Sequence, residues 1–113
     1  MADCLFCRIV AGEIPATIVY QNDQVVAFKD ITPQAPTHVL VIPRVHYPDA
    51  ASLAAGDPDA VVDVLREAGE VAAQEKVEGT GYRVVFNTGP GAGQTVFHAH
   101  AHVLGGRDLQ RLV

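Results

Sequence analysis

The chain has few cysteines and few basic residues, and each shortage excludes a class of protein. Only two of its 113 residues are cysteines, so no disulfide framework holds the fold, and a chain of this length buries enough surface to need none. Eight lysines and arginines stand against 13 aspartates and glutamates, which gives a net charge of −5. Without a basic cluster, binding to a nucleic acid polymer is not expected, and an anionic ligand must be held by local donors.

Long apolar runs and low-complexity segments are also missing. No run approaches the roughly 18 apolar residues that cross a bilayer, so we expect no membrane partner. The amino-terminal MADCLFCRIVAGEIP places an acid before a short apolar patch, which is the wrong order for a secretory signal. We therefore expect one domain over residues 1–113, in the cytoplasm. The reducing conditions there argue against a bridge between Cys4 and Cys7.

The pattern of apolar and turn-forming residues predicts helices mixed with antiparallel strands. Asp3 is expected to cap a short helix that continues through about Ala11. A hairpin is expected from two strands rich in β-branched and aromatic residues, Thr17–Gln21 and Val25–Lys29. The continuous apolar run in Val39–Pro43 predicts a third strand, buried on both faces.

One long helix and two more strands complete the predicted fold. Asp57 and Pro58 form a favourable helix start, because a capping side chain precedes proline at the first helical position. Apolar residues then recur at helical spacing to about Lys76. Tyr82–Asn87 and the segment around His100 are expected as strands. Short connections favour an α+β fold with an antiparallel sheet of about five strands, one long helix and a short N-terminal helix.

The residues best suited to chemistry lie in the segment 89–106, where His98, His100 and His102 occupy alternate positions. In an extended strand these three rings share one face, and the apolar residues between them face the core. The glycines upstream allow backbone N–H groups to approach an anion. The segment therefore predicts a phosphate site with imidazole chemistry. The alternatives are a histidine-rich surface strand and a tight glycine hairpin without a ligand.

These residues resemble the histidine triad (HIT) family. HAHAHV at 98–103 fits the family signature, in which histidine and apolar residues alternate, and DITPQAPTH at 30–38 is similar to the upstream block of its Hint branch. GQTVF at 93–97 and LGGR at 104–107 extend the match. The resemblance implies a HIT-like α+β fold and a nucleotide hydrolase or transferase. For the Hint branch it implies a homodimer that cleaves the P–N bond of purine nucleoside 5′-phosphoramidates, the adenylyl-amine type derived from AMP or GMP.

The resemblance also implies a role for each site residue. His100 is the nucleophile, which forms a covalent nucleotidyl-histidine that water then hydrolyses, without a catalytic cofactor. His102 contacts the phosphoryl oxygens and assists proton transfer, while His38 and His98 orient the other rings. The implied substrate-binding residues are Gly93, Gln94 and Thr95 for phosphate, Asn87 and Asp30 for ribose and its phosphate, and Leu5, Phe6, Phe28 and Ile31 for the base.

A second group resembles the structural zinc site of HIT members that begin with Cys-x-x-Cys: Cys4, Cys7, His46 and His98. Two thiolates and two imidazoles suit tetrahedral zinc, and a closed site of this kind leaves no water for metal catalysis. The alternatives are two half-buried thiols on a helix and an ordinary loop histidine. Because His98 also belongs to the triad, its two ring nitrogens are expected to divide the two tasks.

Three other functions stay open. They are a purine-nucleotide-binding regulatory module with incidental hydrolysis, a dinucleoside polyphosphate hydrolase of the same family, and a metal hydrolase built on the histidine array. The chain also departs from the Hint pattern in three places. Ala99 and Ala101 replace bulky aliphatic residues, Thr95 stands where serine is commoner, and the tail after Arg107 lacks an aromatic ending. These departures leave the substrate preference open.

Overall fold

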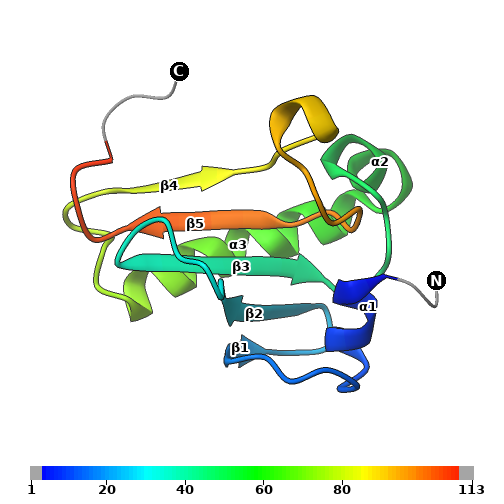
Figure 1. Ribbon diagram of the computed structural model, residues 1–113, viewed down its shortest axis with the longest axis horizontal. Coiled ribbons are helices and arrows are strands. Elements are labelled where there is room, and N and C mark those ends of the chain that lie inside the picture. Colours follow the sequence, from blue (N-terminus) through cyan, green and yellow to red (C-terminus); the bar gives the residue numbers. More distant parts are fainter. Residues whose placement is uncertain (1–3, 110–113) are drawn as a thin grey trace.

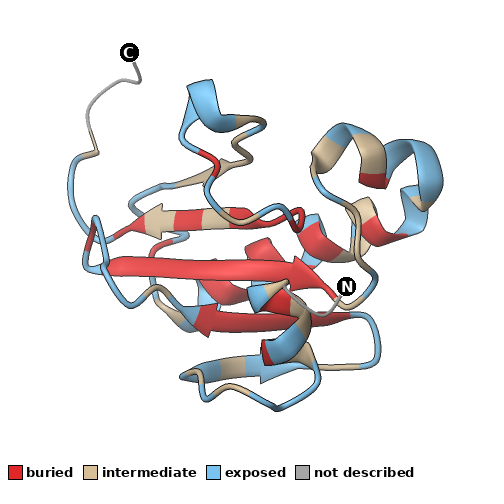
Figure 2. Cartoon of the chain, turned by 45° about the vertical axis from the view of Figure 1, so that its right-hand side comes forward, coloured by how far each residue is buried: buried red, intermediate tan, exposed pale blue. Residues whose placement is uncertain are grey.

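The computed structural model describes residues 4–109, and its centre is a five-stranded antiparallel sheet with the order β1-β2-β3-β5-β4 (Figure 1). The strands are β1 (Ile18–Gln21), β2 (Val25–Lys29), β3 (Thr37–Pro43), β4 (Tyr82–Val85) and β5 (Ala101–Gly105). β3 is buried along its whole length, as predicted for a central strand, whereas the edge strand β1 is largely exposed (Figure 2). The α+β prediction is confirmed.

Helices cover both faces of this sheet. α3 (Pro58–Gln74) lies behind the sheet in Figure 1 and packs its buried Val64 and Val71 on apolar residues of β2, β3 and β5. α1 (Leu5–Val10) packs Phe6 on apolar residues of β2 and β3 that belong to a second cluster. None of the helices within residues 4–109 is long and apolar enough to cross a membrane.

A helix that the sequence analysis did not predict, α2 (Ala50–Gly56), precedes α3. Asp49 caps α2 by accepting a hydrogen bond from the Ser52 N–H at 2.8 Å, and alanines with high helix propensity fill its turns. Asp57 ends α2 and caps α3, as predicted, by accepting from the Ala60 N–H at 3.3 Å. The only sequence signal for α2 was the Asp49 cap, because so short a helix shows no clear periodicity.

The ends of two helices differ from the prediction. The expected cap Asp3 lies outside the described residues, and at the start of α1 the Cys4 sulfur accepts from the Cys7 N–H at 3.3 Å. α3 ends at Gln74, earlier than expected. The reason is Lys76, whose φ of 62° is left-handed and cannot continue a right-handed helix.

The histidine segment enters the sheet later than predicted. β5 begins at Ala101, so His102 lies within the strand while His98 and His100 precede it. The Ala99 N–H donates at 2.7 Å to a carbonyl of the loop after β3, and this bond draws the chain away from β3. The predicted alternation still holds, because Ala99 and Ala101 are both buried in apolar clusters beside the helices.

Candidate active site

Two hydrogen bonds to main-chain carbonyls decide which nitrogens of His98 and His100 carry hydrogen. His98 Nε2 lies 2.8 Å from the Pro43 carbonyl oxygen, and His100 Nδ1 lies 2.8 Å from the His98 carbonyl oxygen. Because a carbonyl oxygen only accepts, both of these nitrogens must be N–H donors. The neutral His100 ring therefore keeps a lone pair on Nε2, the form that a nucleophile requires.

The tautomers of His38 and His102 follow from a backbone donor. The Gln34 N–H donates to His38 Nδ1 at 3.0 Å, so the hydrogen of the neutral ring is on Nε2. His38 Nε2 lies 2.9 Å from His102 Nδ1 and 3.5 Å from Asp30 Oδ2. His102 Nδ1 thus accepts, and His102 carries its own hydrogen on Nε2. The same bond disfavours a metal among Asp30, His38 and His102, although their ligand atoms lie within 4.8 Å of one another, because His38 Nε2 is already protonated.

Burial keeps the four rings neutral. It lowers the pKa of His38, His98 and His100 below the ordinary value of 6.5, although the charge of Asp30 opposes this for His38 and His100. Burial, with the neighbouring His100 and His38 rings, lowers the pKa of His102 to about 4. Near neutral pH the site therefore presents an unprotonated nucleophile beside an imidazole N–H donor.

The His100 ring is held between two other rings. Phe6 of α1 meets it edge to face, with centroids 5.0 Å apart and an interplanar angle of 85°. His102 lies on its other flank, also with a centroid distance of 5.0 Å. Because His100 is only 8% exposed, these contacts leave its ring little freedom to turn. The N-terminal helix therefore helps to position the candidate nucleophile.

A pocket of about 270 Å³ collects most of the predicted site residues. Those that line it are Leu5, Phe6, Phe28, Asp30, Ile31, Thr95, His100 and His102, and the sequence analysis did not identify Ile9, Lys29, Thr32, Leu40 and Val96. Leu40 pairs with His102 across β3 and β5, so only the strand register could have identified it. The pocket combines apolar side chains, the phenylalanines among them, with the polar Asp30, His100 and His102.

The glycine segment contributes differently from the prediction. The Gly93 and Gln94 N–H groups donate to carbonyls of the preceding turn at 3.0 and 3.1 Å, so they are not free for an anion. The buried Gln94 side chain accepts from the Gly89 N–H and donates to two further carbonyls, which fixes the loop. Thr95 is the one member of the predicted phosphate segment that lines the pocket. Asn87 lies two residues beyond β4 and does not line it.

Next to this pocket the structure gathers the four predicted zinc ligands. The ligand atoms of Cys4, Cys7, His46 and His98 all lie within 4.8 Å of one another. Cys4 Sγ and Cys7 Sγ each lie 3.5 Å from His98 Nδ1. Cys7 Sγ also lies 3.3 Å from His46 Nδ1, and the Nδ1 atoms of His46 and His98 are 3.2 Å apart. Burial and the neighbouring Cys4 raise the pKa of the Cys7 thiol to about 11. The His98 ring thus belongs to this cluster, and the main-chain carbonyl of His98 holds His100 Nδ1–H.

The fold and the site together define a class of protein. The model of the HIT domain family matches residues 11–109, and the chain therefore belongs to this family, as the sequence motifs predicted. It is a HIT-family hydrolase that acts on nucleotides.

Its relatives include enzymes and solved structures of the same length. Purine nucleoside phosphoramidase of Escherichia coli (strain K12) is 44% identical over 107 residues, which cover 95% of this chain and 90% of that protein. A HIT family hydrolase from Clostridium thermocellum is 40% identical, with a TM-score of 0.95, over 100% of this chain and 98% of that one. A histidine triad protein from Clostridium difficile is 39% identical, with a TM-score of 0.94, over 100% of this chain and 98% of that one.

Proposed function

We propose that the protein hydrolyses the P–N bond of purine nucleoside 5′-phosphoramidates through a covalent intermediate on His100. The observation that carries the proposal is the fixed tautomer of His100, whose Nδ1–H is held by a carbonyl while the ring lines a pocket of about 270 Å³. The similarity to an enzyme named purine nucleoside phosphoramidase supports this choice of substrate.

The pocket has a suitable group for each part of a nucleotide. Phe6 and Phe28, whose rings pack edge to face at 5.4 Å, offer an apolar wall for a purine. Asp30 Oδ1 is taken by the Thr32 N–H at 2.8 Å, which leaves Oδ2 to accept from a ribose hydroxyl. The Thr95 hydroxyl and His102 Nε2–H lie on the same pocket as donors for phosphoryl oxygens.

The reaction then proceeds in two displacements. Before the first displacement, the bridging nitrogen of the substrate takes up one proton from solvent. As His100 Nε2 bonds to phosphorus, the P–N bond breaks and a neutral amine leaves. Water next attacks phosphorus, the bond between phosphorus and His100 breaks, and the proton lost by the water goes to the released amine or to buffer. His100 returns to its neutral form, and the products are the nucleoside monophosphate and the amine.

His102 has a more restricted role in this scheme than the sequence suggested. Because its Nε2 already carries hydrogen and its Nδ1 accepts from His38, it stabilises the phosphoryl charge as a donor and does not act as a base. His38 is a positioning residue, since it fixes that tautomer through the bond from the Gln34 N–H.

The test of this function is hydrolysis followed by trapping. Adenosine 5′-phosphoramidate should be converted to AMP, and rapid acid-free quenching should reveal a protein whose intact mass has increased by one adenylyl group. Peptide mapping should place that group on His100. Tight AMP binding without turnover would instead favour the regulatory-module alternative.

We further propose that Cys4, Cys7, His46 and His98 hold a structural zinc ion. Tetrahedral zinc with bonds of about 2.3 Å to sulfur and about 2.0–2.1 Å to nitrogen requires S···N separations near 3.6 Å and N···N separations near 3.3 Å. The observed distances of 3.3–3.5 Å and 3.2 Å fit that requirement. His98 Nε2 donates to the Pro43 carbonyl, which leaves Nδ1 free to bind the metal. When bound, the zinc would join α1 to the loop after β3, and a reducing cytoplasm would keep both thiols available.

We also propose that two copies associate through α3 and the edge strand β4. Val62 and Leu65 on α3 are 50% and 48% exposed, and Tyr82 on β4 is 40% exposed. The Tyr82 hydroxyl approaches α3 at Gly69, one turn after Leu65, so Leu65 and Tyr82 are the apolar side chains placed beside the outer edge of β4, whereas Val62 lines a hollow with Gln24. A twofold axis perpendicular to the sheet, beside that edge, would pair β4 with β4 antiparallel and bring both α3 helices together on the same face, as a symmetric dimer requires.

Substitution of the exposed Leu65 on this surface should separate the copies. Wild-type protein should sediment with twice the mass of the chain, whereas Leu65→Asp should sediment as a monomer, because each dimer would bury two carboxylates. Ile18→Asp provides the matched control, since Ile18 is 41% exposed on the opposite edge strand and should stay dimeric. Sedimentation velocity at equal concentrations measures this, and an unchanged mass for Leu65→Asp would reject the interface.

A further inference from the structure

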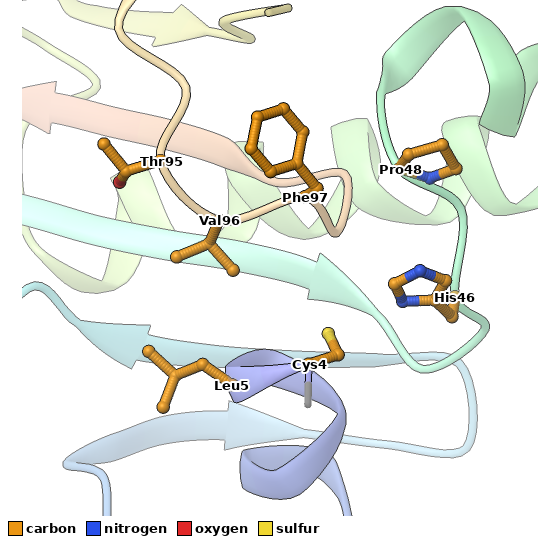
Figure 3. A pocket seen from close by; sticks show the side chains of 7 residues that line it. All are labelled: Cys4, Leu5, His46, Pro48, Thr95, Val96 and Phe97. Atoms are coloured by element: carbon orange, nitrogen blue, oxygen red, sulfur yellow. The ribbon is translucent and has the colours of Figure 1, made fainter. Parts of the chain in front are cut away.

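A second hollow, larger than the nucleotide pocket, opens beside it. Its volume is about 690 Å³, within the range of small-molecule sites. Figure 3 shows Cys4 and Leu5 from the start of α1 on one side, Val96 and Phe97 opposite them, and His46 and Pro48 from the loop after β3 on a third side. Nothing in the two-step reaction described above uses this space.

The two hollows meet at a shared border. Leu5, Thr95 and Val96 line both of them, whereas His100 and His102 line only the nucleotide pocket. Thr95, which carries the hydroxyl expected to face the phosphoryl group, therefore stands at the junction. A group attached to phosphorus can reach the outer hollow across this border while the nucleoside remains in the inner pocket.

In-line displacement determines which group goes outward. The nucleophile and the leaving group occupy opposite sides of phosphorus in the transition state. With His100 on the inner side and the purine against the wall of Phe6 and Phe28, the remaining direction for the departing nitrogen is toward the shared border. Its substituent then enters the outer hollow when the P–N bond breaks.

The lining of the outer hollow selects the chemistry of that substituent. Within residues 4–109 no acidic side chain lines it, and Leu5, Pro48, Val96 and Phe97 supply an apolar surface. Cys4 and His46 also line it, but their ligand atoms already have partners, because Cys4 Sγ lies 3.5 Å and His46 Nδ1 lies 3.2 Å from His98 Nδ1 in the four-donor cluster. A cationic substituent would lose hydration there without gaining a carboxylate partner from the described part of the chain, whereas an apolar group loses nothing.

We propose that this hollow is the subsite for the leaving amine and that it selects neutral alkyl or arylalkyl substituents over cationic ones. The inference rests on the proposed phosphoramidase function and names its substrate class. Phe97, 46% exposed at the hollow, is the specificity-determining residue, since its ring offers the largest apolar surface to a substituent.

The experiment compares three adenosine 5′-phosphoramidates made from primary alkylamines: methylamine, 3-phenylpropylamine and 1,3-diaminopropane. For wild-type protein, kcat/KM from AMP release should be at least about tenfold higher for the phenylpropyl than for the methyl compound, and lowest for the cationic diamine. In Phe97→Ala the ratio of phenylpropyl to methyl should fall by about tenfold. In Phe97→Glu, which places a carboxylate in the hollow, the diamine should become preferred over the phenylpropyl compound.

Tyr20→Ala is the matched control, because Tyr20 is an aromatic residue of similar exposure on the distant β1, and it should leave all three ratios unchanged. Equal kcat/KM values for the three substrates in wild-type protein, or unchanged ratios in both Phe97 variants with wild-type melting temperatures, would overturn the subsite and leave the phosphoramidase function standing. Failure of wild-type protein to hydrolyse any of the three would overturn the function itself, and with it the subsite.

Discussion

His100→Ala is expected to reduce kcat for adenosine 5′-phosphoramidate by at least about 10⁴-fold, because the substitution removes the atom that bonds to phosphorus. AMP should still bind, since the purine wall of Phe6 and Phe28 and the Oδ2 atom of Asp30 are unaffected. The rate of AMP release measures turnover, and calorimetry separately measures the affinity for AMP. The adenylyl adduct should be absent from the intact mass of this variant. An adduct that persists in His100→Ala would assign the nucleophile to another residue.

His102→Gln tests whether the second ring of the site is a donor or a base. A glutamine amide can donate a hydrogen bond but cannot accept a proton, so it replaces a donor and does not replace a base. The hydrogen bonds from the Gln34 N–H to His38 and from His38 to His102 Nδ1 leave His102 Nε2 as a donor. His102→Gln should therefore retain far more activity than His102→Ala. Loss of one donor to a charged transition state costs about 10²–10³-fold. Equal losses in the two variants would show that His102 moves a proton.

Local patterns were sufficient for much of this architecture. The cap at Asp57 and the following helical stripe predicted α3, and the sequence pattern predicted the bounds of β1 to β4 within two residues, whereas β5 begins later than expected. Alternation correctly placed His100 and His102 in one pocket, since they flank the first residue of β5, although the chain bends at His98. The family motifs then supplied the residues around the pocket, of which Leu5, Phe6, Phe28, Asp30, Ile31 and Thr95 do line it.

What the sequence could not provide depends on main-chain atoms from distant segments. The protonated nitrogen of His98 is fixed by the Pro43 carbonyl, 55 positions away, and no side-chain pattern encodes that bond. The amide donors expected at Gly93 and Gln94 form turn bonds instead, because the left-handed Gly93, with φ of 91°, closes a short 3-10 turn. The apolar hollow at Phe97 likewise arises where three segments meet, so its shape follows from packing and not from any one of them.

Zinc removal is expected to lower the melting temperature of the protein strongly. Purified protein should contain one zinc ion per chain, and Cys7→Ser should lose it and melt about 10 °C or more below wild type, since metal binding to a folded site adds directly to folding free energy. Replacement of zinc by Co²⁺ should give the intense visible absorption of tetrahedral thiolate coordination. Elemental analysis, Co²⁺ spectra and thermal melts measure these outcomes without an activity assay.

The same substitution should also affect catalysis, for a reason specific to this site. His98 provides the ring that faces the four-donor cluster and the carbonyl that holds His100 Nδ1–H at 2.8 Å. Loss of the metal removes one of the two bonds that hold the His98 ring, leaving only the hydrogen bond to the Pro43 carbonyl, and the His98 carbonyl then holds the nucleophile less rigidly, so kcat should fall while AMP affinity changes little. Arg8→Ser is a suitable control, because Arg8 lies on the same helix and is half exposed beside Glu13. If Cys7→Ser matched Arg8→Ser in zinc content, melting temperature and kcat, the four residues would be an ordinary hydrogen-bonded cluster and the zinc proposal would fail.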